Sequence, residues 1–69
     1  MNDDIYQDME VRVIDDYTVT VGFDNQWLTY VAQIQKSGAT ELYSESGYTK
    51  ELAFERSVDL INLLNSSTV

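Results

Sequence analysis

The chain has 69 residues, twelve of them acidic and four basic, and a formal net charge of −8 at pH 7. This length allows one hydrophobic core, so we expect a single domain over residues 1–69. The charge excludes ordinary nucleic-acid binding, which needs clustered cations, and the lack of histidine and cysteine removes the usual general base, thiol nucleophile, disulfide and thiolate metal site.

The N-terminal segment, residues 5–14, is compatible with two elements. Every second residue from Met9 to Val13 is apolar, as in a β-strand. Four apolar residues also share one face of a helix that Asn2 or Asp3 could cap, namely Ile5, Tyr6, Met9 and Val13. The helix is favoured, because a second helix would help to cover the sheet predicted downstream.

Three segments in the middle of the chain alternate apolar and polar residues, at 17–23, 28–36 and 39–44. The turn-forming cluster at residues 24–26 separates the first two, and Gly38 offers the positive φ that a tight hairpin needs. These features predict an antiparallel meander.

The C-terminal third predicts a helix over residues 50–64, with Thr49 as its N-cap. Its apolar residues cover a wide arc, and Glu51, Glu55 and Asp59 form an acidic stripe. The arc is wider than one sheet face requires, which indicates a second contact, with an N-terminal helix or with another copy of the chain. The fold class is therefore α+β: a meander of three strands, or four if the N-terminal segment is a strand, packed against a C-terminal helix, with a short N-terminal helix.

The predicted core consists of residues on the inward phase of these elements. They are Val19, Val21, Ile34, Leu42, Phe54, Val58 and Ile61. Tyr43 and Tyr48 are expected to close the rim of this core, and Trp27 either closes the rim or anchors an interface.

No motif of a catalytic or metal site is present. The pairs Asp3-Asp4 and Asp15-Asp16 match no calcium-loop spacing, and the three glycines stand too far apart to cradle a phosphate. We therefore expect no enzymatic activity, no cofactor and no metal. The acidic N-terminus and the lack of a long apolar run predict a cytoplasmic protein with no membrane partner.

Binding remains as the function. A single basic partner could reach the acids at the predicted turns and strands if these acids form one negative surface. These acids are Asp15, Asp16, Asp24, Glu41 and Glu45.

Residues 16–19 (Asp-Tyr-Thr-Val) begin a strand, Gly38 lies in a hairpin, and residues 43–46 (Tyr-Ser-Glu-Ser) precede an amphipathic helix. This order and spacing resembles the small acidic type II-A anti-CRISPR proteins of phages, over about residues 16–63. The resemblance implies a helix before a three-stranded sheet, and a protein that occupies the protospacer-adjacent-motif site of an RNA-guided nuclease by mimicking DNA phosphates.

Asp16, Tyr17 and Gly38 match the pattern of that family, so the resemblance adds Tyr17 and Gly38 to the acids and Trp27 as predicted partner-binding residues. It also implies a phage origin and action in the cytoplasm of a host cell.

Two functions follow as hypotheses. The first is an inhibitor that places carboxylates in a cationic groove of a partner such as an RNA-guided nuclease complex. The alternative is a small homo-oligomeric structural or assembly module, a homodimer for example, with the wide helix face as its interface and no nucleic-acid mimicry. Salt separates the two, because it weakens an electrostatic mimic and spares a hydrophobic dimer.

Overall fold

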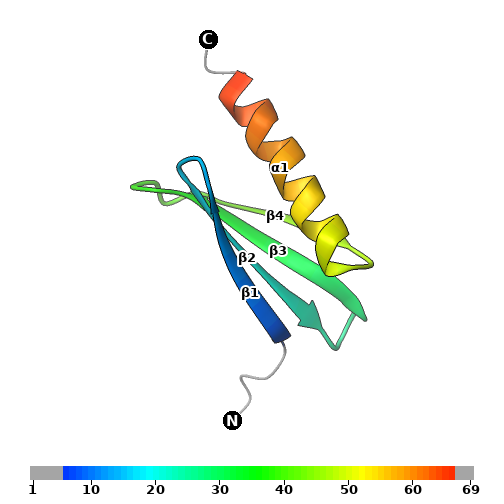
Figure 1. Ribbon diagram of the computed structural model, residues 1–69. Helices are drawn as coiled ribbons and strands as arrows, with labels where there is room; N and C mark the ends of the chain where they lie inside the picture. Colours follow the sequence, from blue (N-terminus) through cyan, green and yellow to red (C-terminus); the bar gives the residue numbers. More distant parts are fainter. Residues whose placement is uncertain (1–5, 67–69) are drawn as a thin grey trace.

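The computed structural model describes residues 6–66, which form four β-strands followed by one α-helix (Figure 1). The elements are β1 (Tyr6–Ile14), β2 (Tyr17–Asp24), β3 (Thr29–Lys36), β4 (Leu42–Gly47) and α1 (Lys50–Ser66). The strands form one antiparallel sheet in the order β1-β2-β3-β4, so each strand pairs with the next along the chain. The predicted α+β meander with a C-terminal helix is confirmed.

The N-terminal segment is a strand, so the helix prediction is wrong over Tyr6–Ile14 and the four-stranded alternative holds. Val11 pairs with Thr20 and Val13 with Thr18 of β2. The backbone of β1 is paired with the next strand across the turn at residues 15–16, and the periodicity within residues 5–14 could not reveal this pairing. Residues 1–5, which include the proposed helix cap, lie outside the described residues.

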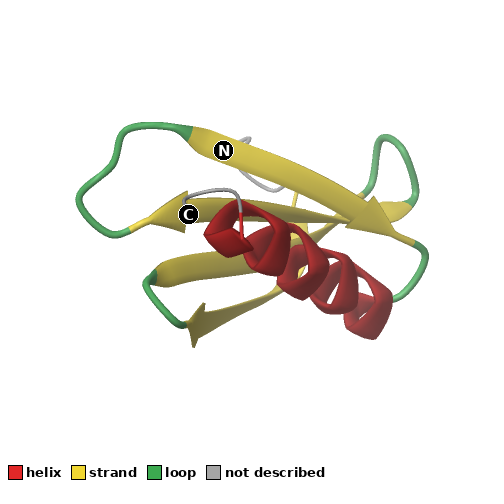
Figure 2. Ribbon diagram, turned by 90° about the horizontal axis from the view of Figure 1, so that it is seen from above, coloured by secondary structure: helices red, strands yellow, loops and turns green. Residues whose placement is uncertain are grey.

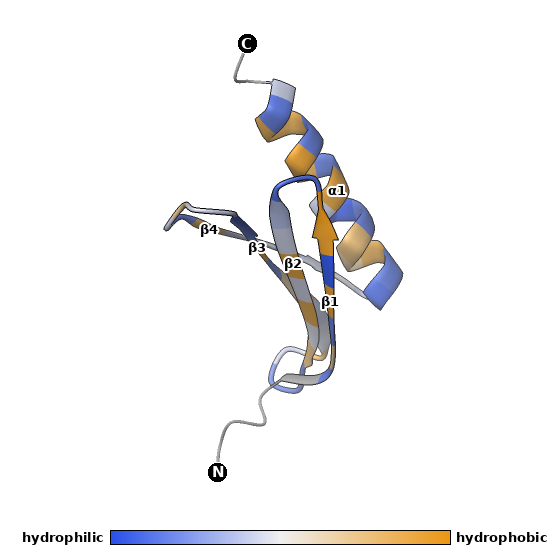
Figure 3. Cartoon of the chain, turned by 60° about the vertical axis from the view of Figure 1, so that its left-hand side comes forward, coloured by the Kyte–Doolittle hydropathy of each residue, from blue (hydrophilic) through white to orange (hydrophobic). Residues whose placement is uncertain are grey.

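The helix lies across one face of the sheet and leaves the other face uncovered (Figures 2 and 3). The two central strands supply most of the sheet side of the core, and the helix supplies Phe54 and Ile61. The buried apolar residues are Tyr17, Val19, Val21, Ala32, Ile34, Ala53, Phe54 and Ile61. Five of the predicted core residues are thus confirmed: Val19, Val21, Ile34, Phe54 and Ile61.

Two core predictions and one rim prediction fail. Leu42 is 60% exposed, because it pairs with Gln35 and therefore shares the face opposite the helix. Tyr48 is 84% exposed beyond the end of β4, and Val58 is only partly buried. Tyr43, in contrast, packs against the core as expected.

The junction between β4 and α1 depends on two small residues. The Thr49 hydroxyl accepts a hydrogen bond from the Leu52 N–H at 3.0 Å, which confirms the predicted N-cap. A Cβ atom on Gly47 would lie 2.8 Å from the backbone nitrogen of Ala53, so a glycine is needed for the first turn of the helix to approach the strand this closely.

We expect Phe54→Ala to lower the free energy of unfolding by roughly 3–5 kcal/mol, because it leaves a cavity between α1 and the sheet. Leu63→Ala on the exposed side of the same helix is the control, and its effect should stay within about 0.5 kcal/mol. Urea unfolding followed by circular dichroism measures both. Equal losses for the two variants would contradict the packing of α1.

Candidate interaction surface

Two of the predicted acids occupy the turn between β1 and β2. Asp15 adopts a left-handed backbone conformation with φ 55, which aspartate tolerates better than most residues, and its carboxylate accepts a hydrogen bond from Asn65 of α1 at 3.4 Å. The carbonyl of Asp16 accepts a hydrogen bond from the Ser37 N–H at 2.8 Å. The turn is thereby tied to the end of the helix and to the loop after β3.

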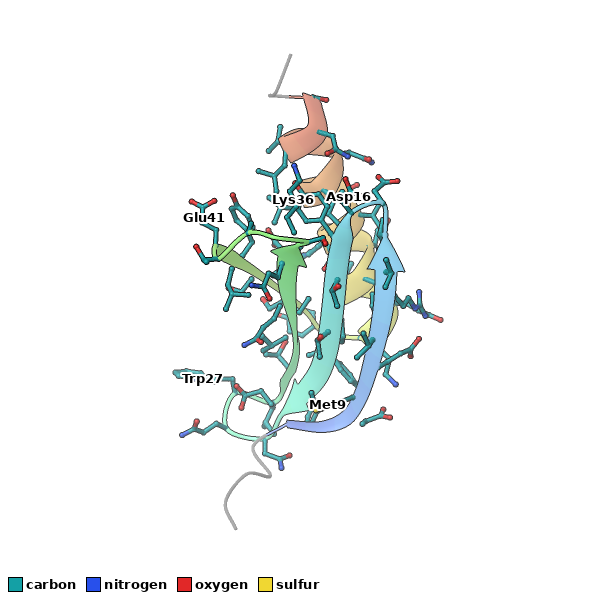
Figure 4. All side chains as sticks on the ribbon, turned by 90° about the vertical axis from the view of Figure 1, so that its left-hand side faces the viewer. Met9, Asp16, Trp27, Lys36 and Glu41 are labelled. Atoms are coloured by element: carbon teal, nitrogen blue, oxygen red, sulfur yellow. The ribbon has the colours of Figure 1, made fainter. Side chains whose placement is uncertain are left out.

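Gly38 and Glu41 lie at the same end of the sheet, in the loop between β3 and β4. Gly38 has the expected positive φ, at 81. The Glu41 carboxylate accepts a hydrogen bond from the Tyr43 hydroxyl at 2.9 Å, and this bond raises the pKa of Tyr43. Asp16, Lys36 and Glu41 all lie at this end (Figure 4). The structure therefore brings the acids of both turns together, but with a cation among them.

Asp24 and Trp27 lie at the opposite end, in and beside the turn between β2 and β3 (Figure 4). Asp24 is only 6% exposed, and its carboxylate accepts hydrogen bonds from the N–H groups of Gln26 at 2.8 Å and Trp27 at 3.4 Å. Trp27 itself is 76% exposed. The carboxylate of Asp24 thus holds the turn that presents Trp27.

The remaining two predicted residues lie elsewhere again. Tyr17 is 5% exposed and belongs to the core. Glu45 pairs with Ala32, so it shares the helix-covered side of the sheet, on the edge strand β4. Asp15, Asp16, Asp24, Glu41 and Glu45 therefore do not form the one contiguous surface predicted from the sequence.

Opposite charges gather along the β1 side of the helix. The Lys50 ammonium lies 3.1 Å from Asp8 and 3.6 Å from Glu10, and its hydrogen bond to Asp8 raises its pKa. Arg12 bonds to Glu10 at 2.8 Å, which lowers the pKa of that carboxyl, and its guanidinium lies 3.9 Å from the centre of the Phe54 ring. The acids at this edge are thus largely balanced.

The solvent side of α1 carries the acidic stripe predicted from the sequence. Glu51, Glu55 and Asp59 follow one another at four-residue spacing and are all exposed. Glu45, Arg56 and Asp59 also line a shallow surface hollow between β4 and the helix.

The face of the sheet that the helix leaves uncovered, which we call the open face, carries no exposed charged side chain among residues 8–66. The alternation along β2 places Asp24 on this face, but its carboxylate is buried in the turn between β2 and β3, where it accepts a hydrogen bond from the Gln26 N–H. The side chains of the open face are aliphatic, hydroxyl or amide groups. The residues are Met9, Val11, Val13, Thr18, Thr20, Gly22, Thr29, Val31, Gln33, Gln35, Leu42, Ser44 and Ser46.

This surface was not predicted from the sequence, although a signal for it is present there. In strands with one solvated face the outward positions often carry Lys, Glu or Asp, whereas the outward positions of β2 and β3 are threonine, glycine, valine and glutamine up to the last residue of β2, Asp24.

Two depressions mark the open face. One lies over Gly22, which has no side chain, and is lined by Met9, Thr20, Val31 and Gln33. The other runs beside Trp27, along Thr29, Val31, Ser44 and Ser46, and extends to Glu45 on the edge strand β4, whose register places it on the opposite, helix-covered side. Exposed Trp27 thus stands next to the uncharged surface.

Among the described residues, no group of three or more acidic side chains is placed to hold a metal ion. Within residues 6–66, no helix has both the length and the apolar character needed to cross a membrane.

No protein-family model, curated protein or solved structure matches the chain.

We expect Asp24→Ala to lower the free energy of unfolding by about 1–2 kcal/mol, because the two turn N–H groups lose their acceptor. Asp24→Asn keeps a side-chain oxygen and should lose less. Chemical denaturation followed by circular dichroism compares the two. Parent-like stability of the alanine variant would contradict the role assigned to this carboxylate.

Proposed function

We propose that this protein is a small, non-catalytic assembly module that self-associates through the open face of its sheet. The observation that supports this function is the lack of exposed charge on that face in a chain with net charge −8. Removing a charged side chain from water is costly unless it is paired, and the cores of protein interfaces are depleted in charged residues. The open face can be covered without that cost.

The apolar content of this region fits the same function. Met9, Val11, Val13 and Leu42 are all more than half exposed, and each lies on the open face. Trp27 stands at its rim and is the type of residue that most often anchors an interface. In the helix arc, by comparison, Leu60 and Leu64 already pack against the core. The interface is therefore assigned to the sheet instead of the helix face expected from the sequence.

The size of the core is a second reason for association. A chain of this length buries little apolar surface and commonly gains stability from disulfides, a structural metal or oligomerisation. The sequence contains no cysteine, and the described residues contain no candidate metal cluster. A second layer over the open face would supply the missing burial.

We expect the mass in solution to rise from one chain to a multiple of it as the protein concentration increases. Raising the salt concentration from about 0.05 M to about 0.5 M should strengthen the association, because it screens the repulsion between two acidic chains. Sedimentation equilibrium at several concentrations measures both effects. A single-chain mass at every concentration and salt would exclude this function.

One observation favours the inhibitor hypothesis as a second candidate. Glu51, Glu55 and Asp59 form an exposed row, and residues four apart on a helix are separated by about 6 Å along its axis. Such a row could meet arginines and lysines of a basic groove, such as the one that binds DNA in an RNA-guided nuclease.

For this candidate, Glu55→Gln with Asp59→Asn should weaken binding to a guide-loaded type II-A nuclease by about 2 kcal/mol or more, with a loss of the salt dependence. The control is Asp15→Asn with Asp16→Asn, which removes the same charge from the turn beside the C-terminal end of α1, outside the row. Titration calorimetry at low and high salt measures the difference. A parent protein that does not bind the nuclease would contradict an acidic mimic, and equal affinities for the two double variants would contradict the assignment of binding to the helix row.

A further inference from the structure

The free edge of β4 is protected against pairing with another strand. Backbone groups of successive strand residues point alternately to the two neighbouring sides. The Gly47 carbonyl accepts a hydrogen bond from the Thr29 hydroxyl of β3 at 2.9 Å, so the Ser46 carbonyl faces outward. The guanidinium of Arg56 donates a hydrogen bond to that carbonyl at 2.9 Å. The helix thereby occupies an acceptor that an added strand would use.

The free edge of β1 is protected in a different way. Its pairing with β2 is interrupted by a bulge between Gln7 and Glu10, where Asp8 takes a positive φ of 54. Bulges and charged side chains both hinder the addition of a strand to an edge. Asp8, Glu10 and Arg12 supply such charges on β1.

The third surface, the outer side of α1, is acidic in every copy. Glu51, Glu55 and Asp59 of two chains would repel each other across a helix-to-helix contact. If two copies instead met through their open faces, sheet-to-sheet and helix-to-sheet spacings of about 10 Å would put the two acidic rows at least about 30 Å apart. That separation exceeds the screening length of about 8–10 Å at ordinary ionic strength.

We propose that two copies of this chain pack open face to open face and form a closed, four-layered dimer in the order helix, sheet, sheet, helix. The proposal rests on the self-association proposed above and names its partner and its geometry. A second copy fits because two uncharged open faces can meet without burying an unpaired charge. The protected edges of β1 and β4, in turn, hinder the addition of further strands into an open-ended sheet. Two-fold contacts of this kind are self-complementary and end at two copies.

The area is consistent with a weak dimer. Four strands about 4.8 Å apart, each rising about 3.3 Å per residue over some eight residues, give a projected face of roughly 500 Å². Two such faces bury roughly 1,000 Å², at the small end of specific interfaces, so we expect dissociation in the micromolar range or above. The hollow over Gly22 and the rim residue Trp27 offer concave and convex features for the two surfaces to interlock.

Gln33→Glu tests the geometry. Gln33 is exposed on β3, in the cross-strand row of Val11, Thr20 and Ser44 at the middle of the open face. The matched control is Asn62→Asp on the exposed side of α1, since both variants turn an exposed amide into a carboxylate and reach the same net charge. We expect Gln33→Glu to raise the dimer dissociation constant at least about tenfold, and Asn62→Asp to change it less than about twofold, as measured by sedimentation equilibrium. Circular dichroism establishes that both variants remain folded.

A mixing experiment separates a lost contact from a damaged fold. Gln33→Glu and Gln33→Lys should each be mainly monomeric, yet an equimolar mixture should form a heterodimer, because opposite charges then face one another. The sheet-to-sheet dimer is overturned if the parent is dimeric and neither single variant weakens the association, or if the mixture stays monomeric. Self-association through another surface would then remain the proposed function. A parent protein whose mass never exceeds that of one chain would contradict both self-association and the sheet-to-sheet dimer.

Discussion

The packing of Phe54 and Ile61 against Val19 and Ile34 is the contact on which the rest of the structure depends. Through this contact, the only helix in the described part of the chain covers one face of a four-stranded sheet. A sheet has two faces, and 69 residues provide material for one core. The opposite face is therefore left to solvent or to a partner, and its composition decides which of them it suits.

Charge is distributed unevenly around that core. Acids occupy the turns, the helix and the edges, where water solvates them or a cation pairs with them, as Lys50 does with Asp8. The open face instead carries groups such as Thr20 and Gln33, which are polar enough for a soluble monomer and inexpensive to cover. In the proposed dimer, solubility and association are thereby assigned to different sides of one small molecule. A strongly acidic chain can then present a neutral surface.

The alternation of apolar and polar residues was sufficient to predict β2, β3 and the phase of Val19 and Ile34, because burial on one face imposes that pattern directly. It was insufficient for β1, where strand and helix periods coincide and pairing with β2 decided the outcome. The position of Asp24 follows from topology: in a meander, alternate turns lie at opposite ends, so this acid could not join Asp16. The role of its carboxylate in the turn required atomic geometry.

Trp27 is the single tryptophan of the chain, and its indole stands out from the turn between β2 and β3 instead of entering the core. Its emission, excited selectively in the presence of five tyrosines, is therefore that of an indole already in water. Unfolding would shift the emission little, whereas any molecule that covers the turn would move it to shorter wavelength. The chain thus carries an intrinsic optical reporter that responds to contact at the rim of the sheet and is nearly silent to the state of the core.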